Sequence, residues 1–299
     1  MPCIKSASRE KGLMDKIFLC DGHNLAFRAF YGIRELSRSD GFPTNMIHGW
    51  LRSFWRLEDD FSPGQIWVFF DLGGCPQRES ILPEYKANRG SPPEGFSEQL
   101  EWVKKLSVAL GYGVGESTGR EADDLIAAKV KELSAGNELV IVSADKDLGQ
   151  LVCKGVSQLL PPPTANPRIG WRLLDANGLE EKFGIPPNLL LDYLSIIGDQ
   201  SDNIPGLAGV GPKTAVKWLK EWGSLDGIIE NAGRITPKRF GSVIYEKREL
   251  LQRNKELIKL DDTFHETDFK PGSPQIEAME EILSEMEMHK SLEEVKRRY

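Results

Sequence analysis

The hydrophobic positions in the first half of the chain fall into short runs, and three of these runs lead into an aspartate. Runs of four to eight apolar, β-branched or aromatic residues are typical of strands that are buried on both faces of a parallel sheet. The three runs are Lys16–Cys20 before Asp21, Ile66–Phe70 before Asp71, and Leu139–Ala144 before Asp145. Helical periodicity lies between them, over residues 45–57, 96–110 and 121–133. Residues 15–160 therefore predict a wound α/β domain with a mainly parallel sheet and flanking helices.

The second half of the chain changes to helical spacing. Residues 189–197 predict a helix that ends just before Asp199. A glycine-rich segment, Gly206–Lys213, then precedes a further helical pattern. Glycines ahead of a helix leave backbone N–H groups free to bind phosphate, and Lys213 and Lys217 lie one turn apart to assist. The segment indicates a contact with a nucleic-acid backbone, with a plain turn between two helices as the alternative.

Composition narrows the class of protein. The 299 residues are 40% hydrophobic and 28% charged, which is ordinary for a soluble globular protein. No apolar stretch approaches the roughly 20 residues of a membrane span. The first 14 residues lack the apolar core of a secretory signal, so we expect residues 1–15 to form a loose extension. The four cysteines lack zinc-site spacing, which favours reduced thiols in a cytoplasmic protein.

Nine carboxylates in four short clusters carry the strongest chemical signal. Acids at the carboxyl ends of parallel strands converge on one crevice, and like charges packed together require cations. Ligation by oxygen alone suits Mg2+ or Mn2+. Taken singly, any of these acids could instead be a helix cap or a solvated loop residue. The nine are Asp21, Asp71, Glu121, Asp123, Asp124, Asp145, Asp147, Asp199 and Asp202.

The net charge of −7 does not exclude nucleic acid as a partner. Nine of the negative charges belong to the acid clusters, and the distribution of charge matters more than its sum. Lys86, Arg89, Lys213, Lys217 and Lys220 are candidates for a local positive track, although solvated surface lysines are the alternative for Lys217 and Lys220.

Several motifs, in their order and spacing, resemble those of the 5′-nuclease (flap endonuclease) family. The resemblance is closest to the 5′→3′ exonuclease domain of bacterial DNA polymerase I and its free-standing relatives, and it covers roughly residues 16–272. The motifs are Asp21-Gly-His-Asn with Arg28-Ala-Phe30, the strand end at Asp71, Pro83-Glu-Tyr-Lys-Ala-Asn-Arg89, Glu121-Ala-Asp-Asp124, Ser143-Ala-Asp-Lys-Asp-Leu148, and Gly198-Asp-Gln-Ser-Asp-Asn-Ile-Pro-Gly206 with the glycine-rich segment that follows.

The resemblance implies a PIN-like α/β nuclease domain over residues 16–182, with a helical arch near 83–105. A helix–three-turn–helix DNA-binding region is expected to follow over 183–272. Residues 273–299 are expected to form a tail helix, to which we assign no chemistry.

The same resemblance assigns roles to residues. Two Mg2+ ions, with Mn2+ as a substitute, would be held by Asp21, Asp71, Glu121 and Asp123 on one side and by Asp145, Asp147, Asp199 and Asp202 on the other, with Asp123 as the bridge and Asp124 beside the ligands. Lys86 and Arg89 would stabilise the scissile phosphate, and Tyr85 would offer a stacking face to an unpaired base. The resemblance assigns contacts with the DNA backbone to Arg28, Gly206, Gly209, Gly211, Lys213, Thr214 and Lys217. It also allows a K+ ion to bind at the hairpin formed by the glycine-rich segment.

The implied activity is a metal-dependent 5′→3′ exonuclease and structure-specific 5′-flap endonuclease. It would act on branched or 5′-ended DNA, or on RNA primers in hybrids, as a monomer that cooperates in trans with a DNA polymerase. Two alternatives remain. A PIN-type ribonuclease would lack the glycine-rich hairpin, and a catalytically silent branched-DNA-binding protein would keep costly like charges together without using them.

Overall fold

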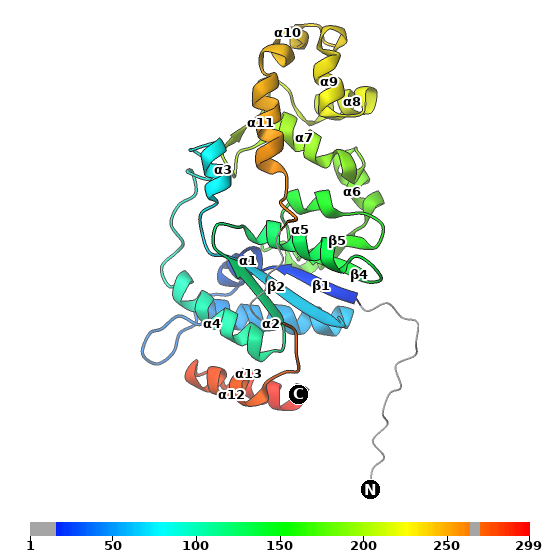
Figure 1. The fold of residues 1–299 in the computed structure, drawn as a ribbon. Coiled ribbons are helices and arrows are strands. Elements are labelled where there is room, and N and C mark those ends of the chain that lie inside the picture. The colour runs from blue at the N-terminus through cyan, green and yellow to red at the C-terminus, as the bar shows by residue number, and fades with distance from the viewer. Residues whose placement is uncertain (1–15, 264–269) are drawn as a thin grey trace.

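The computed structural model describes residues 16–263 and 270–299, so the expected N-terminal extension lies outside the described residues. A twisted sheet occupies the middle of the molecule, with a helical lobe at one end and two C-terminal helices at the other (Figure 1). The strand order is β3-β2-β1-β4-β5-β6; the first five strands are parallel, and β6 is antiparallel to β5. Their bounds are β1 Lys16–Asp21, β2 Gln65–Asp71, β3 Gly113–Ser117, β4 Glu138–Val142, β5 Val156–Leu160 and β6 Arg172–Leu174.

Both faces of the sheet are covered, as the near-continuous apolar runs predicted. Side chains alternate along each strand, so Phe18 and Cys20 of β1 pack on one face while Ile17 and Leu19 pack on the other. Helix α5 (Ala122–Leu133) covers the face of Ile17 and Leu19. The opposite face packs against α1 Gly22–Gly32, α2 Asn45–Phe61 and α4 Phe96–Ala109.

The predicted helical lobe has its own core around the fully buried Trp218. A short hairpin, β7 (Gly198–Asp199) with β8 (Ile204–Pro205), interrupts its helices. The helices are α6 Ala176–Phe183, α7 Leu190–Ile197, α8 Pro212–Trp222, α9 Leu225–Glu230, α10 Arg239–Glu246 and α11 Arg248–Ile258. The α/β class and the change to helices in the second half are confirmed.

Two details differ from the sequence-based expectations. The apolar run before Asp145 forms β4, which ends at Val142 and not at Ala144; the next residue, Ser143, donates its hydroxyl to Asp21 at 2.8 Å. The tail forms two helices, α12 (Ile276–Glu285) and α13 (His289–Arg298), where one was expected. These helices pack against the α2–α4 face of the sheet domain through buried residues such as Leu283.

The predicted arch segment divides into two parts. Helix α3 (Pro76–Ile81) leads into turns and loop over residues 82–95. Helix α4 then packs into the sheet-domain core through Phe96, Val103 and Leu106. Within the described ranges, no helix has the length and apolar character that a membrane span requires.

Candidate metal and nucleic-acid site

The strand-end acids meet at the carboxyl edge of the sheet, and the local fold gives each of them a fixed position. Asp21 ends β1 and caps α1 by accepting a hydrogen bond from the Asn24 N–H, at 3.0 Å. Asp71 ends β2 and accepts a hydrogen bond from the Ala122 N–H at the start of α5, at 2.6 Å. Because helix N-termini favour negative charge, the sheet topology and the helix caps hold these acids together.

Electrostatics place Asp21, Asp71, Asp123 and Asp145 in one neighbourhood. The pKa of Asp21 is raised to about 7, mainly by burial; the charges of Asp71 and Asp145 add to the rise, and hydrogen bonds from the Asn24 N–H and the Ser143 hydroxyl oppose it. Burial also raises the pKa of Asp123 well above its usual value, with the charges of Asp145, Asp21 and Asp71 adding to the effect. Such mutual destabilisation of charged forms is what a bound cation relieves.

A second group consists of Asp147, Asp199 and Asp202, whose carboxylate oxygens lie within 4.8 Å of one another. Asp147 Oδ1 is buried and has no hydrogen-bond partner in the structure. Burial raises the pKa of Asp147 well above its usual value, and the charges of Asp145 and Asp199 contribute. A buried oxygen without a donor, surrounded by further carboxylates, fits a hard divalent cation.

Asp145 lies between the two groups. Its charge acts on Asp21 and Asp123 on one side and on Asp147 on the other. Burial raises its own pKa, and Asp202 and Asp199 raise it further, while a hydrogen bond from the Asp147 N–H opposes the rise. Asp145 is therefore electrostatically linked to both groups, while the bridging role that the resemblance gives to Asp123 stays a prediction.

Glu121 turns toward cationic and hydroxyl groups. Its carboxylate accepts hydrogen bonds from Lys86 Nζ at 2.6 Å, from the Tyr85 hydroxyl at 3.0 Å and from Arg78 at 3.0 Å. The structure therefore brings Glu121 to the basic loop that follows α3, where it neutralises Lys86 beside the acids.

Asp124 is fully paired inside the protein. Arg78 of α3 donates to both of its carboxylate oxygens at 2.7 Å, and the Asp261 N–H adds a third hydrogen bond at 2.9 Å. Asp124 is only 1% exposed. With both oxygens paired, Asp124 holds its neighbours in place, which fits the expected position beside the metal ligands.

Arg78 is a residue that the sequence reasoning missed. It also donates to the carbonyls of Leu257 and Lys259 at the end of α11, at 2.9 and 3.2 Å. One guanidinium thus ties α3 and α5 to the last helix of the helical lobe. A single arginine in a short polar helix carries no sequence signal for such a role, because its partners come from distant parts of the chain.

The basic loop, residues 83–93 with Lys86 and Arg89 against Glu84, is joined to the turn between β7 and β8 by hydrogen bonds to backbone carbonyl oxygens. The Lys86 N–H donates to the Asp202 carbonyl at 3.0 Å, and Lys86 has a left-handed backbone with φ 55°. Asn88 donates to the Gln200 carbonyl at 2.7 Å, and Asn203 donates to the Glu84 carbonyl at 2.8 Å. A non-glycine residue at positive φ is held there only when its surroundings fix it, so the position of Lys86 is built into the site.

The three residues assigned to the arch base have different environments. Arg89 donates to Asp202 at 2.5 Å and keeps half of its side chain exposed. Tyr85 is only 8% exposed, and its hydroxyl contacts Glu121 and also Asp202, at 3.2 Å. Lys86 and Arg89 are thus placed beside the acids, whereas the buried ring of Tyr85 offers no stacking face to a base, which corrects that expectation.

The glycine-rich segment forms the turn before α8. Gly211 caps this helix, and Lys213 is exposed in its first turn next to Thr214. Lys217 contacts the Thr236 hydroxyl at 3.0 Å. A Cβ atom on Gly206 would lie 2.1 Å from the Ile197 carbonyl oxygen, so this position requires glycine for close backbone packing, and its DNA contact stays a prediction.

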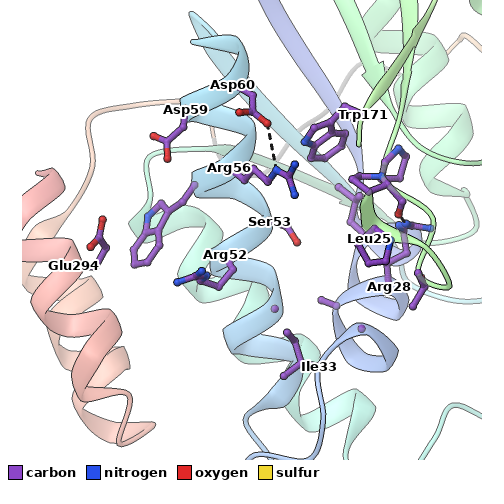
Figure 2. A pocket seen from close by; sticks show the side chains of 18 of the residues that line it. Leu25, Arg28, Ile33, Arg52, Ser53, Arg56, Asp59, Asp60, Trp171 and Glu294 are labelled. Atoms are coloured by element: carbon purple, nitrogen blue, oxygen red, sulfur yellow. Dashed lines mark hydrogen bonds and ion pairs between the residues drawn. The ribbon is translucent and has the colours of Figure 1, made fainter. Parts of the chain in front are cut away.

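Arg28 lies apart from the acids. It lines a hollow of about 610 Å3 between α1, α2, the loop over residues 161–171 and α13, and its guanidinium donates to the Pro162 carbonyl (Figure 2). None of the nine acids lines this hollow. Its other charged residues are Arg52, Arg56, Arg297, Arg298, Asp59, Asp60 and Glu294.

Two family models match consecutive parts of the chain. Residues 16–184 match the model described as 5′-3′ exonuclease, N-terminal resolvase-like domain, and residues 185–281 match the one described as 5′-3′ exonuclease, C-terminal SAM fold. A 5′-3′ exonuclease of Aquifex aeolicus is 34% identical over 287 residues, which are 94% of this chain and 96% of that protein. The thermostable DNA polymerase I of Thermus filiformis is 36% identical over 93% of this chain, and the chain spans only about a third of its length, 33%.

Solved structures share the fold at low sequence identity. A phage T5 5′-exonuclease with bound zinc ions has a TM-score of 0.70 at 22% identity, over 94% of this chain and 99% of that chain. A T5 flap endonuclease solved with DNA and metal ions has a TM-score of 0.70 at 21% identity, over 95% of this chain and 100% of that chain. The catalytic core of Rad2 in complex with DNA substrate has a TM-score of 0.65 at 13% identity, over 94% of this chain and 91% of that chain.

Proposed function

The chain belongs to the 5′-3′ exonuclease family of nucleases, and we propose that it hydrolyses DNA phosphodiesters at 5′ ends and at the base of 5′ flaps. One observation carries this proposal: carboxylates from separate strands and from the helical lobe converge at one sheet edge beside a loop that carries Lys86 and Arg89. Such a site places groups that bind cations next to groups that bind phosphate, as phosphodiester hydrolysis requires.

We assign two Mg2+ ions, with Mn2+ as a substitute, to the two acid groups. Asp21, Asp71, Glu121 and Asp123 would hold one ion and Asp147, Asp199 and Asp202 the other, with Asp145 between them. When bound, the ions supply Lewis-acid activation of water and charge stabilisation at the leaving oxygen. Support comes from the partnerless oxygen of Asp147 and from the raised pKa values of Asp21 and Asp123.

The residues of the chain supply the positioning. Lys86 and Arg89 place two positive charges beside the acids, paired with Glu121 and Asp202 respectively. Each can bind the scissile phosphate while it stays next to its acid. The exposed Lys213 and the backbone N–H groups at the start of α8 can bind the duplex backbone away from the reaction. A K+ ion in this turn would add to the same contact.

We further infer that the enzyme acts as a cytoplasmic monomer on branched DNA and cooperates with a DNA polymerase in trans. The free thiols of Cys20, Cys75 and Cys153 support a reducing compartment. The relatives in which the matching region is part of a DNA polymerase I support the association with synthesis.

Cleavage of end-labelled 5′-flap DNA in Mg2+, Mn2+ and EDTA tests the function directly. We expect cuts at the flap base and release of nucleotides from recessed 5′ ends, both abolished by EDTA. Tight flap binding without cleavage in either metal would favour the silent DNA-binding protein. Cleavage of single-stranded RNA with no action on DNA would favour the ribonuclease.

A further inference from the structure

Lys146 lies inside the acid cluster, and the roles described so far leave it without a function. It stands between Asp145 and Asp147 in the turn after β4, and its Nζ lies 2.9 Å from Asp199 Oδ2. The side chain of Lys146 is 35% exposed and that of Asp199 only 8%. An ammonium group from the sheet domain therefore reaches into the group formed by Asp147, Asp199 and Asp202.

The contact occupies the oxygen that a cation needs. Asp199 Oδ1 already accepts hydrogen bonds from the Ser201 N–H at 2.9 Å and the Ser201 hydroxyl at 2.7 Å. Its other oxygen, Oδ2, faces the Lys146 ammonium. A divalent ion that binds across Asp147, Asp199 and Asp202 must share or displace this ammonium, because two like charges cannot crowd one carboxylate oxygen without cost.

We propose that Lys146 is an internal counter-ion that competes with the divalent cation for Asp199 and so sets the cation concentration at which this second site fills. The inference rests on the proposed metal-dependent function. In the absence of the ion the ammonium reduces repulsion within the acid cluster. When the ion enters, the flexible and partly exposed lysine stem can release Asp199 into the ion's coordination and turn to solvent.

A different role makes the opposite prediction. If Lys146 only ties the β4 turn to the helical lobe and holds Asp199 in position, its removal should loosen the site and weaken cation binding. If it competes with the cation, its removal should strengthen cation binding. The sign of the change in affinity therefore separates the two roles, and no measurement of cleavage is needed.

The experiment measures Mn2+ binding to the whole protein without DNA, by electron paramagnetic resonance of the free ion. We expect Lys146→Gln to bind one of the two Mn2+ ions about fivefold more tightly and the other as the native protein does, the effect of one partly exposed charge pair. Lys146→Arg keeps the charge and should remain within about twofold of the native protein. Lys154→Gln removes the same formal charge from an exposed position after η1 (Asp147–Leu151) and should leave Mn2+ binding unchanged.

Unchanged or weaker Mn2+ binding by Lys146→Gln would overturn the inference. Lys146→Met repeats the test with a neutral side chain of similar length, so it decides the matter if the Gln variant does not fold. If the native protein cleaves flap DNA and binds two Mn2+ ions while Lys146→Gln and Lys146→Met bind like it, only the role of Lys146 fails. If the native protein neither binds Mn2+ nor cleaves, the proposed function fails as well.

Discussion

Asp145 and Asp147 are two buried carboxylates whose negative charges repel each other and those of their neighbours. Burial raises the pKa of each, and each lies among further carboxylates. The hydrogen bond from the Asp147 N–H to Asp145 Oδ1, at 2.9 Å, fixes the turn that carries both. The native fold therefore maintains an unfavourable arrangement of like charges, which a bound cation would stabilise.

We predict that Asp145→Asn with Asp147→Asn reduces flap cleavage to below about one hundredth of the native rate, since comparable electrostatic groups contribute this much. DNA binding should be retained or tightened, because two negative charges near the phosphates are lost. Gel-shift titrations and single-turnover cleavage in Mg2+ provide the measurements. Near-native turnover would show that the two aspartates do not hold a required ion.

Lys86 contributes positive charge on a fixed backbone. We predict that Lys86→Ala lowers single-turnover cleavage by on the order of 100-fold while binding changes far less, because the contact strengthens as charge develops on the phosphate. The control is Lys105→Ala, which removes an equal charge that contacts the Trp102 ring on α4 and not the acids. An unchanged rate for Lys86→Ala on saturating flap DNA would exclude the loop from the active site.

At the scale of elements, Arg78 joins three helices that are distant in sequence. Arg78→Gln leaves Asp124 buried without its charge partner, so we expect a loss of roughly 3–5 kcal/mol in the free energy of unfolding. The partner variant Asp124→Asn removes the other half of the pair. In a double-mutant cycle by urea unfolding, the two losses should not add, because one pair is broken in each case. Additive losses would mean that the two residues stabilise the fold independently.

Helix α8 presents its N-terminus and Lys213 to solvent. We predict that Lys213→Ala weakens duplex binding and lowers the slope of log Kd against log salt by roughly 0.9, the value for one lost phosphate contact. Lys290→Ala, at an exposed position of α13 on the side of the sheet domain away from the helical lobe, is the matched control and should leave the slope unaltered. A normal slope with collapsed turnover at saturating DNA would instead place Lys213 in the catalytic site.

The sequence predicts elements well where one physical rule dominates. The apolar runs before Asp21 and Asp71 are strands β1 and β2, because only a sheet covered on both faces suits them. The convergence of the strand-end acids follows from the same rule, since parallel strands end at one edge.

The sequence does not predict pairings between residues that lie far apart in the chain. Asp124 meets Arg78 from 46 positions away, and Lys146 meets Asp199 from the helical lobe. No local period or spacing encodes such contacts, which depend on how α3 and the lobe sit against the sheet. Gly206 illustrates the same limit, because the sequence does not show that a Cβ atom at this position would meet the Ile197 carbonyl.

At the scale of the whole molecule, the site lies where the sheet domain and the helical lobe meet. The basic loop, the β7–β8 turn and the α11 end all contact one another or the acids through hydrogen bonds that cross this boundary. The second acid group spans it, since Asp147 follows a strand of the sheet domain and Asp199 belongs to the lobe. The relative position of the domains is therefore part of the site geometry.

The C-terminal helices lie on the side of the sheet domain away from the helical lobe (Figure 1). Leu283 of α12 is fully buried, and Arg298 of α13 pairs with Asp59 of α2 at 2.6 Å. We assign this pair of helices to the stability of the sheet domain, because it extends the core that α2 and α4 already form.

This assignment predicts that Leu283→Ala lowers the free energy of unfolding by about 2–5 kcal/mol, the usual cost of a cavity left by a buried leucine. The rate of flap cleavage below the unfolding transition should stay native, because the acids and the basic loop are untouched. Ser284→Ala, at an exposed position on the same helix, should change neither quantity. Urea unfolding and single-turnover cleavage of all three proteins provide the comparison. A slower rate for Leu283→Ala with unaltered stability would mean that the tail helices take part in holding the substrate.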